Sequence, residues 1–333
     1  MCSMTKYVFQ SKFATQMTSF IKMKTVMGHE RRFYEANLFQ FDSYLCEYHP
    51  NCDLITQEIT TGWKETMANN TRGTIYHKYC VLNAFCRYLN HIGYPCYIPR
   101  LPKWSQSGFV PRIFTHDEIT RMFEFFDNLR MKQHNGNCHY FCIPVLFRLL
   151  YGTGMRMGEA LSLKNKNVDL ESRTILLEIT KNNQHRMIPI NDSLYAVLLQ
   201  YTNEKRKLRR LRRNGPDDYF FVSVLGDDMR ACTVHHYFKQ ALHACGIPRN
   251  AGKIGPRVHD LRHTFAVHSL IQQTKAGTDL YCSLPILSVF LGHKDYRDTE
   301  IYVRLTIDMF PEIIEKEQEF LENVFPTIDE NKQ

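Results

Sequence analysis

The sequence predicts a mainly α-helical protein of two domains: an all-helical N-terminal domain, and an α+β second domain with a small antiparallel sheet. Its 333 residues correspond to about two domains of ordinary length. Apolar residues recur at helical spacing over most of the chain. Residues 173–190 break that spacing and are typical of two strands around a short turn, which predicts the sheet.

The N-terminal domain is expected over residues 1–93, because apolar residues follow helical spacing from about residue 30 onward. The clearest stripe consists of Ile75, Tyr79, Leu82, Phe85, Leu89 and Ile92. Gly93 then offers a helix end. An interdomain linker is expected over 94–112, where several prolines and a polar stretch cannot continue a helix.

The second domain is expected over residues 113–325, with a frayed tail at 326–333. Thr115 is placed to cap the first helix of this domain. Asp117 and Glu118 follow in the first turn, where negative charge is favourable.

Further elements of the second domain follow from local patterns. A buried helix is expected at about 139–151. The segments RTILLEIT and HRMIPI are expected to be strands on either side of the turn KNNQ, because asparagine tolerates left-handed backbone. Helices return after the sheet, and residues 311–325 carry an apolar stripe.

The chain is basic, with 42 Lys and Arg residues against 34 Asp and Glu residues and a formal net charge of +8. That balance favours a polyanionic partner such as DNA. Much of the positive charge lies at 204–215, which is either a solvated helix end or a surface that contacts phosphates. The residues expected to contact DNA there are Lys205, Arg206, Lys207, Arg209 and Arg210.

No long apolar run is present, so no membrane span is expected. The N-terminus lacks the apolar core of a signal peptide, so a cytoplasmic location is expected. The eleven cysteines are interpreted as reduced packing residues. No metal or other cofactor is expected, because two Cys/His groups lack paired zinc-site spacing. These groups are Cys46, His49 and Cys52, and His134, Cys138, His139 and Cys142.

Two short stretches carry polar side chains suited to holding an anion. In YGTGMRMGEALSL, Arg156 opens a helix and Glu159 follows one turn later, either as a simple ion pair or as part of an anion site. In HDLRHTFAVHSL, His259 and Arg262 share a helix face and form a two-donor clamp for a phosphate oxygen. His263 lies behind them.

A third stretch, SVFLGHKDYRDTEIYVRL, places one imidazole and one phenol nine positions apart. Ser283 is expected to cap a buried helix, and a glycine ends that helix just before His293. Asp298 or Thr299 is expected to cap a second helix, which carries Tyr302. The phenol is interpreted either as a core residue or as a nucleophile.

Together these stretches resemble the tyrosine recombinase (phage integrase) family, in particular the integrases of mobile elements. The shared pattern is TG-x-R-x-x-E-x-L, a Lys on a hairpin, H-x-L-R-H-T, L-G-H, and a Tyr nine residues after that His. The matching residues are Arg156, Lys181, His259, Arg262, His293 and Tyr302. The resemblance covers about 113–310, and over 1–95 it depends only on helical character and position. Gly158 replaces a usual Ser, and TKNNQ replaces the usual G-K-G-x-K.

The resemblance implies a site-specific recombinase or integrase that cleaves and rejoins DNA through a 3′-phosphotyrosyl intermediate on Tyr302. His259 would take the phenol proton, and Lys181 would protonate the leaving oxygen. The groups implied to stabilise the transition state are Arg156, Arg262 and His293. The residues implied to support these groups are Glu159 and His263. The resemblance implies no metal, because two arginines replace its charge, and no ATP, because the covalent link conserves the bond energy.

The same resemblance implies double-stranded DNA clamped between the two domains and a homotetramer on two DNA sites, with accessory DNA-bending proteins as further partners. Residues 311–325 would then insert into a neighbouring protomer. The implied source of the gene is a transposon or a phage-like element. Three alternatives stay open: a topoisomerase IB-like enzyme that relaxes DNA, a catalytically silent DNA-binding accessory factor, and a metal nuclease built on a Cys/His group.

Overall fold

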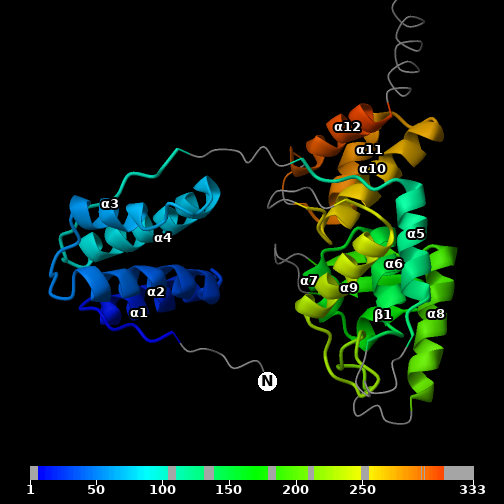
Figure 1. The fold of residues 1–333 in the computed structure, drawn as a ribbon, viewed down its shortest axis with the longest axis horizontal. Coiled ribbons are helices and arrows are strands. Elements are labelled where there is room, and N and C mark those ends of the chain that lie inside the picture. The colour runs from blue at the N-terminus through cyan, green and yellow to red at the C-terminus, as the bar shows by residue number, and fades with distance from the viewer. Residues whose placement is uncertain are drawn as a thin grey trace, which may run out of the picture. The chain divides into compact units, whose positions relative to one another are not determined.

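The computed structural model describes most of the chain, in two compact units that divide between Phe109 and Val110 (Figure 1). The described residues are 7–103, 110–130, 139–178, 185–208, 214–248, 255–293, 295 and 297–310. Each unit has a hydrophobic core of its own.

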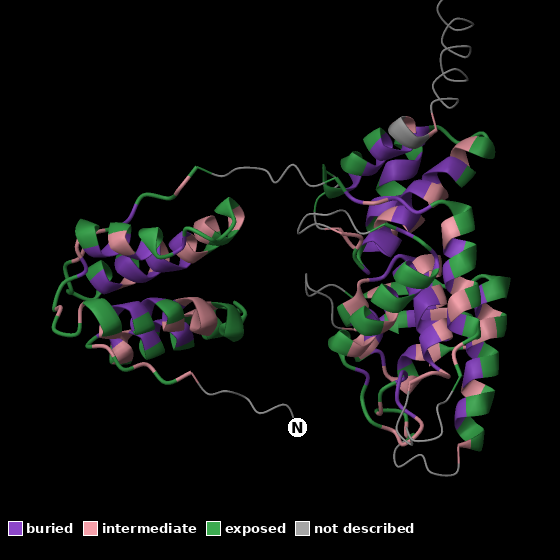
Figure 2. Cartoon of the chain, in the orientation of Figure 1, coloured by how far each residue is buried: buried purple, intermediate pink, exposed green. Residues whose placement is uncertain are grey.

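The described part of the N-terminal unit is helical. Its helices are α1 (Ala14–Val26), α2 (Arg31–Tyr48), α3 (Gln57–Glu65) and α4 (Arg72–His91). Thr56 and Thr71 cap α3 and α4 with their hydroxyl groups, which accept backbone N–H groups of the first turn. The buried faces of the helices pack together around Phe20, Phe41 and Phe85 (Figure 2).

The chain is held to the N-terminal unit within the predicted linker and to the second unit just after it. Asn83 of α4 donates from Nδ2 to the carbonyl oxygen of Pro99 at 2.7 Å, which ties the first part of the linker to the N-terminal unit. In the second unit, the N–H of Phe114 donates to Oγ1 of Thr264 at 3.0 Å. Residues 104–109 lie outside the described residues.

Helices make up most of the described part of the second unit. They are α5 (His116–Asp127), α6 (Ile143–Thr153), α7 (Met157–Ser162), the 3-10 helix η1 (Asn165–Asn167), α8 (Asp192–Lys207), α9 (Ala231–Ala244), α10 (Asp260–Lys275), α11 (Leu280–Leu291) and α12 (Arg297–Met309). Thr115 caps α5 as predicted, in a capping box with Glu118. The expected buried helix is α6, which begins later than predicted, with Pro144 in its first turn.

A small antiparallel sheet completes the second unit. Its strands, in the order β1-β2-β3, are β1 (Val168–Asp169), β2 (Thr174–Leu177) and β3 (Arg186–Pro189). Ile175 pairs with Ile188 across β2 and β3, and both side chains are fully buried. β1 was not predicted, because two residues are too few to show a strand pattern. The predicted fold class is confirmed by these elements.

Helix α10 lies between two hydrophobic clusters, which fixes it firmly. Leu261 at its start belongs to the cluster around α5, α6, α8, α9 and the sheet. Ala266 and Leu270, further along, pack against α11 and α12. A helix packed on several sides holds the polar side chains of its first turns at fixed positions, which suits a site that must be preorganised.

Two predicted helix caps are wrong. α11 begins earlier than predicted, because the carboxylate of Asp279 accepts the N–H of its first turn; Ser283 is buried inside the helix and donates to the carbonyl of Asp279. Asp298 and Thr299 lie within the first turn of α12 rather than before it. The Thr299 hydroxyl instead contacts His293.

Some predicted features cannot be placed. The turn KNNQ at 181–184, the apolar segment 311–325 and the tail at 326–333 lie outside the described residues. Within the described ranges, no helix is long and apolar enough to cross a membrane.

Candidate active site

A glycine turn between α6 and α7 forms one side of the site. Gly154 follows α6 in the left-handed conformation, with φ +58°. A Cβ on Gly154 would lie 2.4 Å from Cδ1 of Phe265, so a side chain does not fit between this turn and α10. Arg156 comes directly after the turn, as the N-cap residue of α7.

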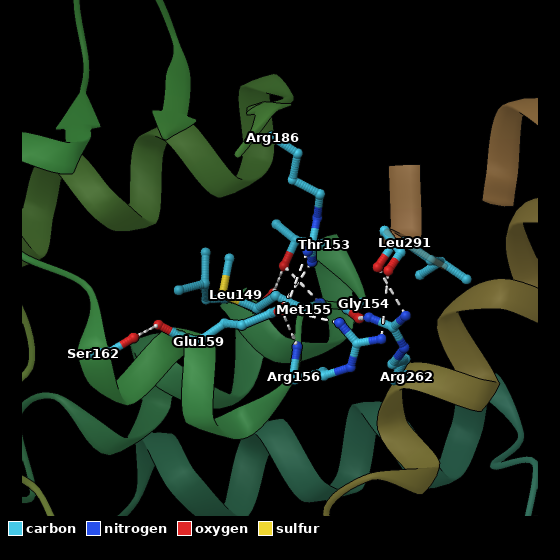
Figure 3. A network of polar contacts seen from close by, with 11 residues as sticks. Leu149, Thr153, Gly154, Met155, Arg156, Glu159, Ser162, Arg186, Arg262 and Leu291 are labelled. Carbon is cyan, nitrogen blue, oxygen red and sulfur yellow. Dashed lines mark hydrogen bonds and ion pairs between the residues drawn. The ribbon is translucent and has the colours of Figure 1, made fainter. Parts of the chain in front are cut away.

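Glu159 is a shared hydrogen-bond acceptor. Its buried carboxylate accepts the backbone N–H of Arg156 at 2.9 Å and the Arg156 guanidinium, also at 2.9 Å. Arg186 of β3 donates to the same carboxylate at 2.7 Å (Figure 3). Burial by itself would raise the pKa of the Glu159 carboxyl, but the hydrogen bonds from Arg186 and Arg156 hold it below its usual value.

Arg262 ties α10 to two neighbouring segments. Its guanidinium donates to the carbonyl oxygens of Gly154 and Leu291, each at 2.8 Å (Figure 3). The residue is 2% exposed. Burial, followed by the nearby charge of Arg156, lowers the pKa of the Arg262 guanidinium to about 10, so the group stays charged near neutral pH.

Tyr302 of α12 is a buried phenol held by a histidine. Its hydroxyl lies 3.1 Å from Nδ1 of His263, and the residue is 2% exposed. The ring of His293 stacks beside it, with centroids 6.1 Å apart. Burial raises the pKa of the Tyr302 phenol, although Arg262 and Arg156 oppose that effect. The phenol is therefore protonated near neutral pH and can donate to His263.

The end of α11 positions His293. Gly292 ends this helix in the left-handed conformation, with φ +68°, which confirms the predicted glycine end. The N–H of His293 donates to the carbonyl oxygen of Ser288 at 3.0 Å. Its Nδ1 lies 2.7 Å from Oγ1 of Thr299, so both the backbone and the ring of His293 are fixed.

The imidazoles near Tyr302 titrate below their usual range. The pKa is lowered to about 3 for His263 and to about 4 for His259 and His293, with burial as the largest cause in each case. For His259 and His293, the charge of Arg262 is the next cause. Near neutral pH these rings are therefore neutral, and each has one ring nitrogen with a free lone pair, while the Arg262 guanidinium stays charged.

The predicted catalytic residues that the structure describes lie in one site: Arg156, His259, Arg262, His293 and Tyr302. The ring of His259, at the start of α10, lies 4.9 Å from the ring of His263, centroid to centroid. Lys181 lies outside the described residues.

Lys205 is not a surface residue, which corrects its assignment to DNA contact. It is 2% exposed, and its ammonium group donates to Oδ1 of Asn165 and to the carbonyl oxygens of Tyr219 and Phe220 at 2.8, 3.1 and 2.8 Å. These acceptors pair with all three N–H donors of the ammonium group, so Lys205 can lie on the buried face of α8 without an unsatisfied donor. Of the other four predicted DNA contacts, Arg206 and Lys207 are exposed, and Arg209 and Arg210 lie outside the described residues.

Arg186 and Thr299 belong to the site, but sequence reasoning missed them. Arg186 shares a strand face with Ile188, which is fully buried. A charged residue two positions from a buried one in an alternating strand is a signal that could have revealed it. Thr299 carried no comparable signal, because a threonine early in a helix is more often a cap.

The two Cys/His groups make packing contacts. The hydroxyl of Tyr44 lies 3.2 Å from Nε2 of His49, and the Cys142 thiol donates to the carbonyl oxygen of His139 at 3.2 Å. In the part of the chain that the structure describes, no group of three or more His, Cys, Asp or Glu side chains is arranged to hold a metal. The residues of these groups outside that part are His134 and Cys138.

Residues 112–308 match the profile of the phage integrase family, which is more than half of the chain. The chain is 27% identical over 314 residues to the integrase/recombinase y4rB of Sinorhizobium fredii, covering 92% of this chain and 97% of that protein. It is 28% identical over 244 residues to the tyrosine recombinase XerC of Bacillus licheniformis, covering 72% of each.

The fold is similar to those of solved recombinase structures. One is the XerH site-specific recombinase bound to a palindromic difH substrate, with a TM-score of 0.64 and 19% identity over 90% of this chain and 83% of that one. Another is the Tn1549 transposon integrase with transposon right end DNA, with a TM-score of 0.60 and 18% identity over 86% and 94%. At these identities the likeness establishes the fold.

Proposed function

The chain belongs to the phage integrase family, and we propose that it is a tyrosine-type site-specific recombinase that cleaves and rejoins double-stranded DNA with Tyr302 as nucleophile. The observation that carries this proposal is the buried Tyr302 hydroxyl, 3.1 Å from Nδ1 of His263 and beside charged guanidinium groups. A phenol next to a proton acceptor and fixed positive charge is suited to attack a phosphodiester. The product is a 3′-phosphotyrosyl link and a free 5′-hydroxyl.

Positive charge in the site favours the phosphate and its transition state. Arg156 and Arg186 share the single carboxylate of Glu159, and Arg262 donates to neutral carbonyl oxygens, so the guanidinium charges exceed the carboxylate charge. A bound phosphodiester would balance that excess. Arg156 and Arg262, together with His293, are the proposed donors to its oxygens, where negative charge grows during attack.

The hydrogen bond of Tyr302 indicates the path of its proton. As the phenolic oxygen forms its bond to phosphorus, the proton passes to Nδ1 of His263. The bond from phosphorus to the 5′ oxygen breaks, and that oxygen keeps the electron pair and takes a proton from Lys181. His263 thus takes the role that the family pattern suggested for His259, which we propose as a further donor to the phosphate.

Covalent trapping tests this function. Duplexes from the flanks of the protein's own gene, each nicked so that the cleaved end diffuses away, are incubated with the full chain and a chelator. A denaturing gel then reveals any protein–DNA adduct. We expect an adduct with the wild-type protein on at least one duplex. We expect none with Tyr302→Phe, because that variant lacks the attacking oxygen.

Other outcomes separate the alternatives. Binding without an adduct on any duplex would favour a DNA-binding accessory factor. Cleavage that leaves no adduct and stops with chelator would favour a metal nuclease. A recombinase and a topoisomerase IB-like enzyme are distinguished with a plasmid that carries two copies of the DNA site at which the adduct forms, called the trapped site. A recombinase deletes or inverts the segment between the two copies, whereas a topoisomerase IB-like enzyme only relaxes the plasmid.

The proposal extends to assembly and source. We propose a tetramer on two DNA sites and a gene carried by a transposon or a phage-like element. Family membership and the similarity to integrase/recombinase y4rB over most of the chain support this. Sedimentation with duplexes that carry the trapped site should give a complex of four 39.3 kDa chains and two duplexes. A complex that stops at one duplex would contradict the tetramer.

A further inference from the structure

We propose that Arg186 is a positioning residue for DNA cleavage. It fixes Arg156 through the carboxylate of Glu159, and it fixes the turn that presents His293 by packing against Gly292. This inference rests on the proposed function of the Tyr302 site and adds a residue that the sequence pattern did not supply.

The contact with Glu159 is a two-point ion pair that is largely buried. Nη2 of Arg186 donates to Oε2 at 2.7 Å and Nη1 donates to Oε1 at 3.1 Å, and the two side chains are 10% and 5% exposed. A planar guanidinium matches a carboxylate in this way, whereas a lysine does not. The same two oxygens also hold Arg156. The position of Arg156 therefore depends on Arg186, although the two arginines come from different elements (Figure 3).

Arg186 also lies directly against the end of α11. A Cβ built on Gly292 would lie 2.6 Å from Nη1 and 3.1 Å from Cζ of Arg186, so the guanidinium packs on the Gly292 backbone. His293 is the next residue in the chain. The carbonyl oxygen of Gly292 also lies 3.5 Å from Nη2 of Arg156. Arg186 thus contacts both the carboxylate that holds Arg156 and the turn that holds His293.

The chemistry of this arginine favours a role in the reaction over a role in the fold alone. Its Nε is buried and has no hydrogen-bond partner among the described residues. A well-packed apolar side chain usually stabilises a fold at least as well as a buried ion pair, so the fold alone gives little reason for a guanidinium here. The terminal nitrogens of Arg186 are directed to Glu159, so Arg186 acts through its neighbours and does not itself bind the phosphate.

The test measures single-turnover cleavage by the full chain on the nicked duplex that traps the wild-type protein. Arg186→Met should slow cleavage about 10- to 100-fold, as when groups that orient active-site ligands are removed, with DNA affinity little changed. Arg186→Lys should also be slow, because a point charge lacks the planar fork. The matched control is Arg173→Met. Arg173 lies just before β2 and pairs with Asp192 on the surface, so this variant should keep the wild-type rate.

A double-mutant cycle separates positioning from an independent effect. If Arg186 acts through Glu159, the variant with both Arg186→Met and Glu159→Gln should cleave no more slowly than the slower single variant. Fully additive effects would overturn the route through Glu159 and leave only the contact with Gly292, and a wild-type rate in Arg186→Met would overturn the whole inference. If that variant does not fold, as judged by circular dichroism, a wild-type rate in Arg186→Lys would overturn it instead. Absence of an adduct with the wild-type protein would refute the proposed function first, and this inference with it.

Discussion

Arginine and histidine side chains around Tyr302 have different protonation states and therefore different roles. Burial and neighbouring positive charge lower the pKa of both kinds, but the pKa of Arg262 falls only to about 10, whereas that of His263 falls to about 3. Near neutral pH the guanidinium therefore supplies charge and the imidazole supplies a lone pair. A site that must both attract a phosphate anion and accept a phenolic proton needs both properties at once.

The hydrogen bond between His263 and Tyr302 leads to a prediction about pH. We expect His263→Ala to slow cleavage by about 10²- to 10⁴-fold near neutral pH, the usual range for loss of a general base. Below the raised pKa of the Tyr302 phenol, the fraction of phenolate grows tenfold per pH unit. The rate of His263→Ala should therefore rise steeply from about pH 6 to pH 9. The measurement is the single-turnover cleavage rate across this range.

His259→Ala serves as the comparison, because its ring lies beside His263 and its pKa is lowered to a similar extent. This variant should lose rate without gaining the steep dependence on pH. The opposite result, in which His259→Ala gains the steep dependence and His263→Ala does not, would return the role of base to His259.

At the level of helices and strands, the sequence predicted what local chemistry determines. The Thr115 cap and the glycine end before His293 were correct, because a cap and a left-handed residue act within a few positions. Ser283 failed as a cap because Asp279, which is equally suitable, comes earlier. Arg186 and Lys205 could not be placed, because their partners lie in other elements and are brought near by the fold alone.

The buried Lys205 on α8 should make the free energy of unfolding depend on pH. Burial lowers its pKa from 10.5 to about 8. Below about pH 8 the ammonium is charged in both states, and the cost of burying it is fully present. Between about pH 8 and pH 10.5 the unfolded chain binds more protons than the folded chain, so this residue makes unfolding progressively less favourable as pH rises. From about pH 7.5 to pH 10, the free energy of unfolding of the wild type should gain about 1–3 kcal/mol relative to Lys205→Met.

Urea titrations of the full chain at several pH values measure that difference. Other groups that titrate in the same range cancel, because both proteins contain them. Lys207→Met replaces an exposed residue of the same helix. Its free energy of unfolding should therefore change with pH in parallel with that of the wild type. A difference between wild type and Lys205→Met that stays constant with pH would show that the ammonium keeps an ordinary pKa in the folded protein.

Over the whole molecule, the net charge of +8 favours DNA binding, but it does not identify the residues that touch DNA. The basic run at 204–215 illustrates the difference. Its lysines and arginines cannot be told apart by charge. Lys205 nevertheless lies on the buried face of α8, whereas Arg206 and Lys207 are exposed. Exposure within a folded helix therefore decides which charges can meet a phosphate.

This distinction can be measured through the salt dependence of DNA affinity. Each phosphate contact releases counterions, so the logarithm of the association constant falls with the logarithm of salt concentration by about 0.9 per contact. If Arg206 and Lys207 contact the backbone, replacing both by Ala should make this slope shallower by about 2. Lys205→Met should leave the slope unchanged, because its ammonium already donates to three protein oxygens. Equal slopes in all three proteins would mean that the exposed part of the run is a solvated helix end that does not contact DNA.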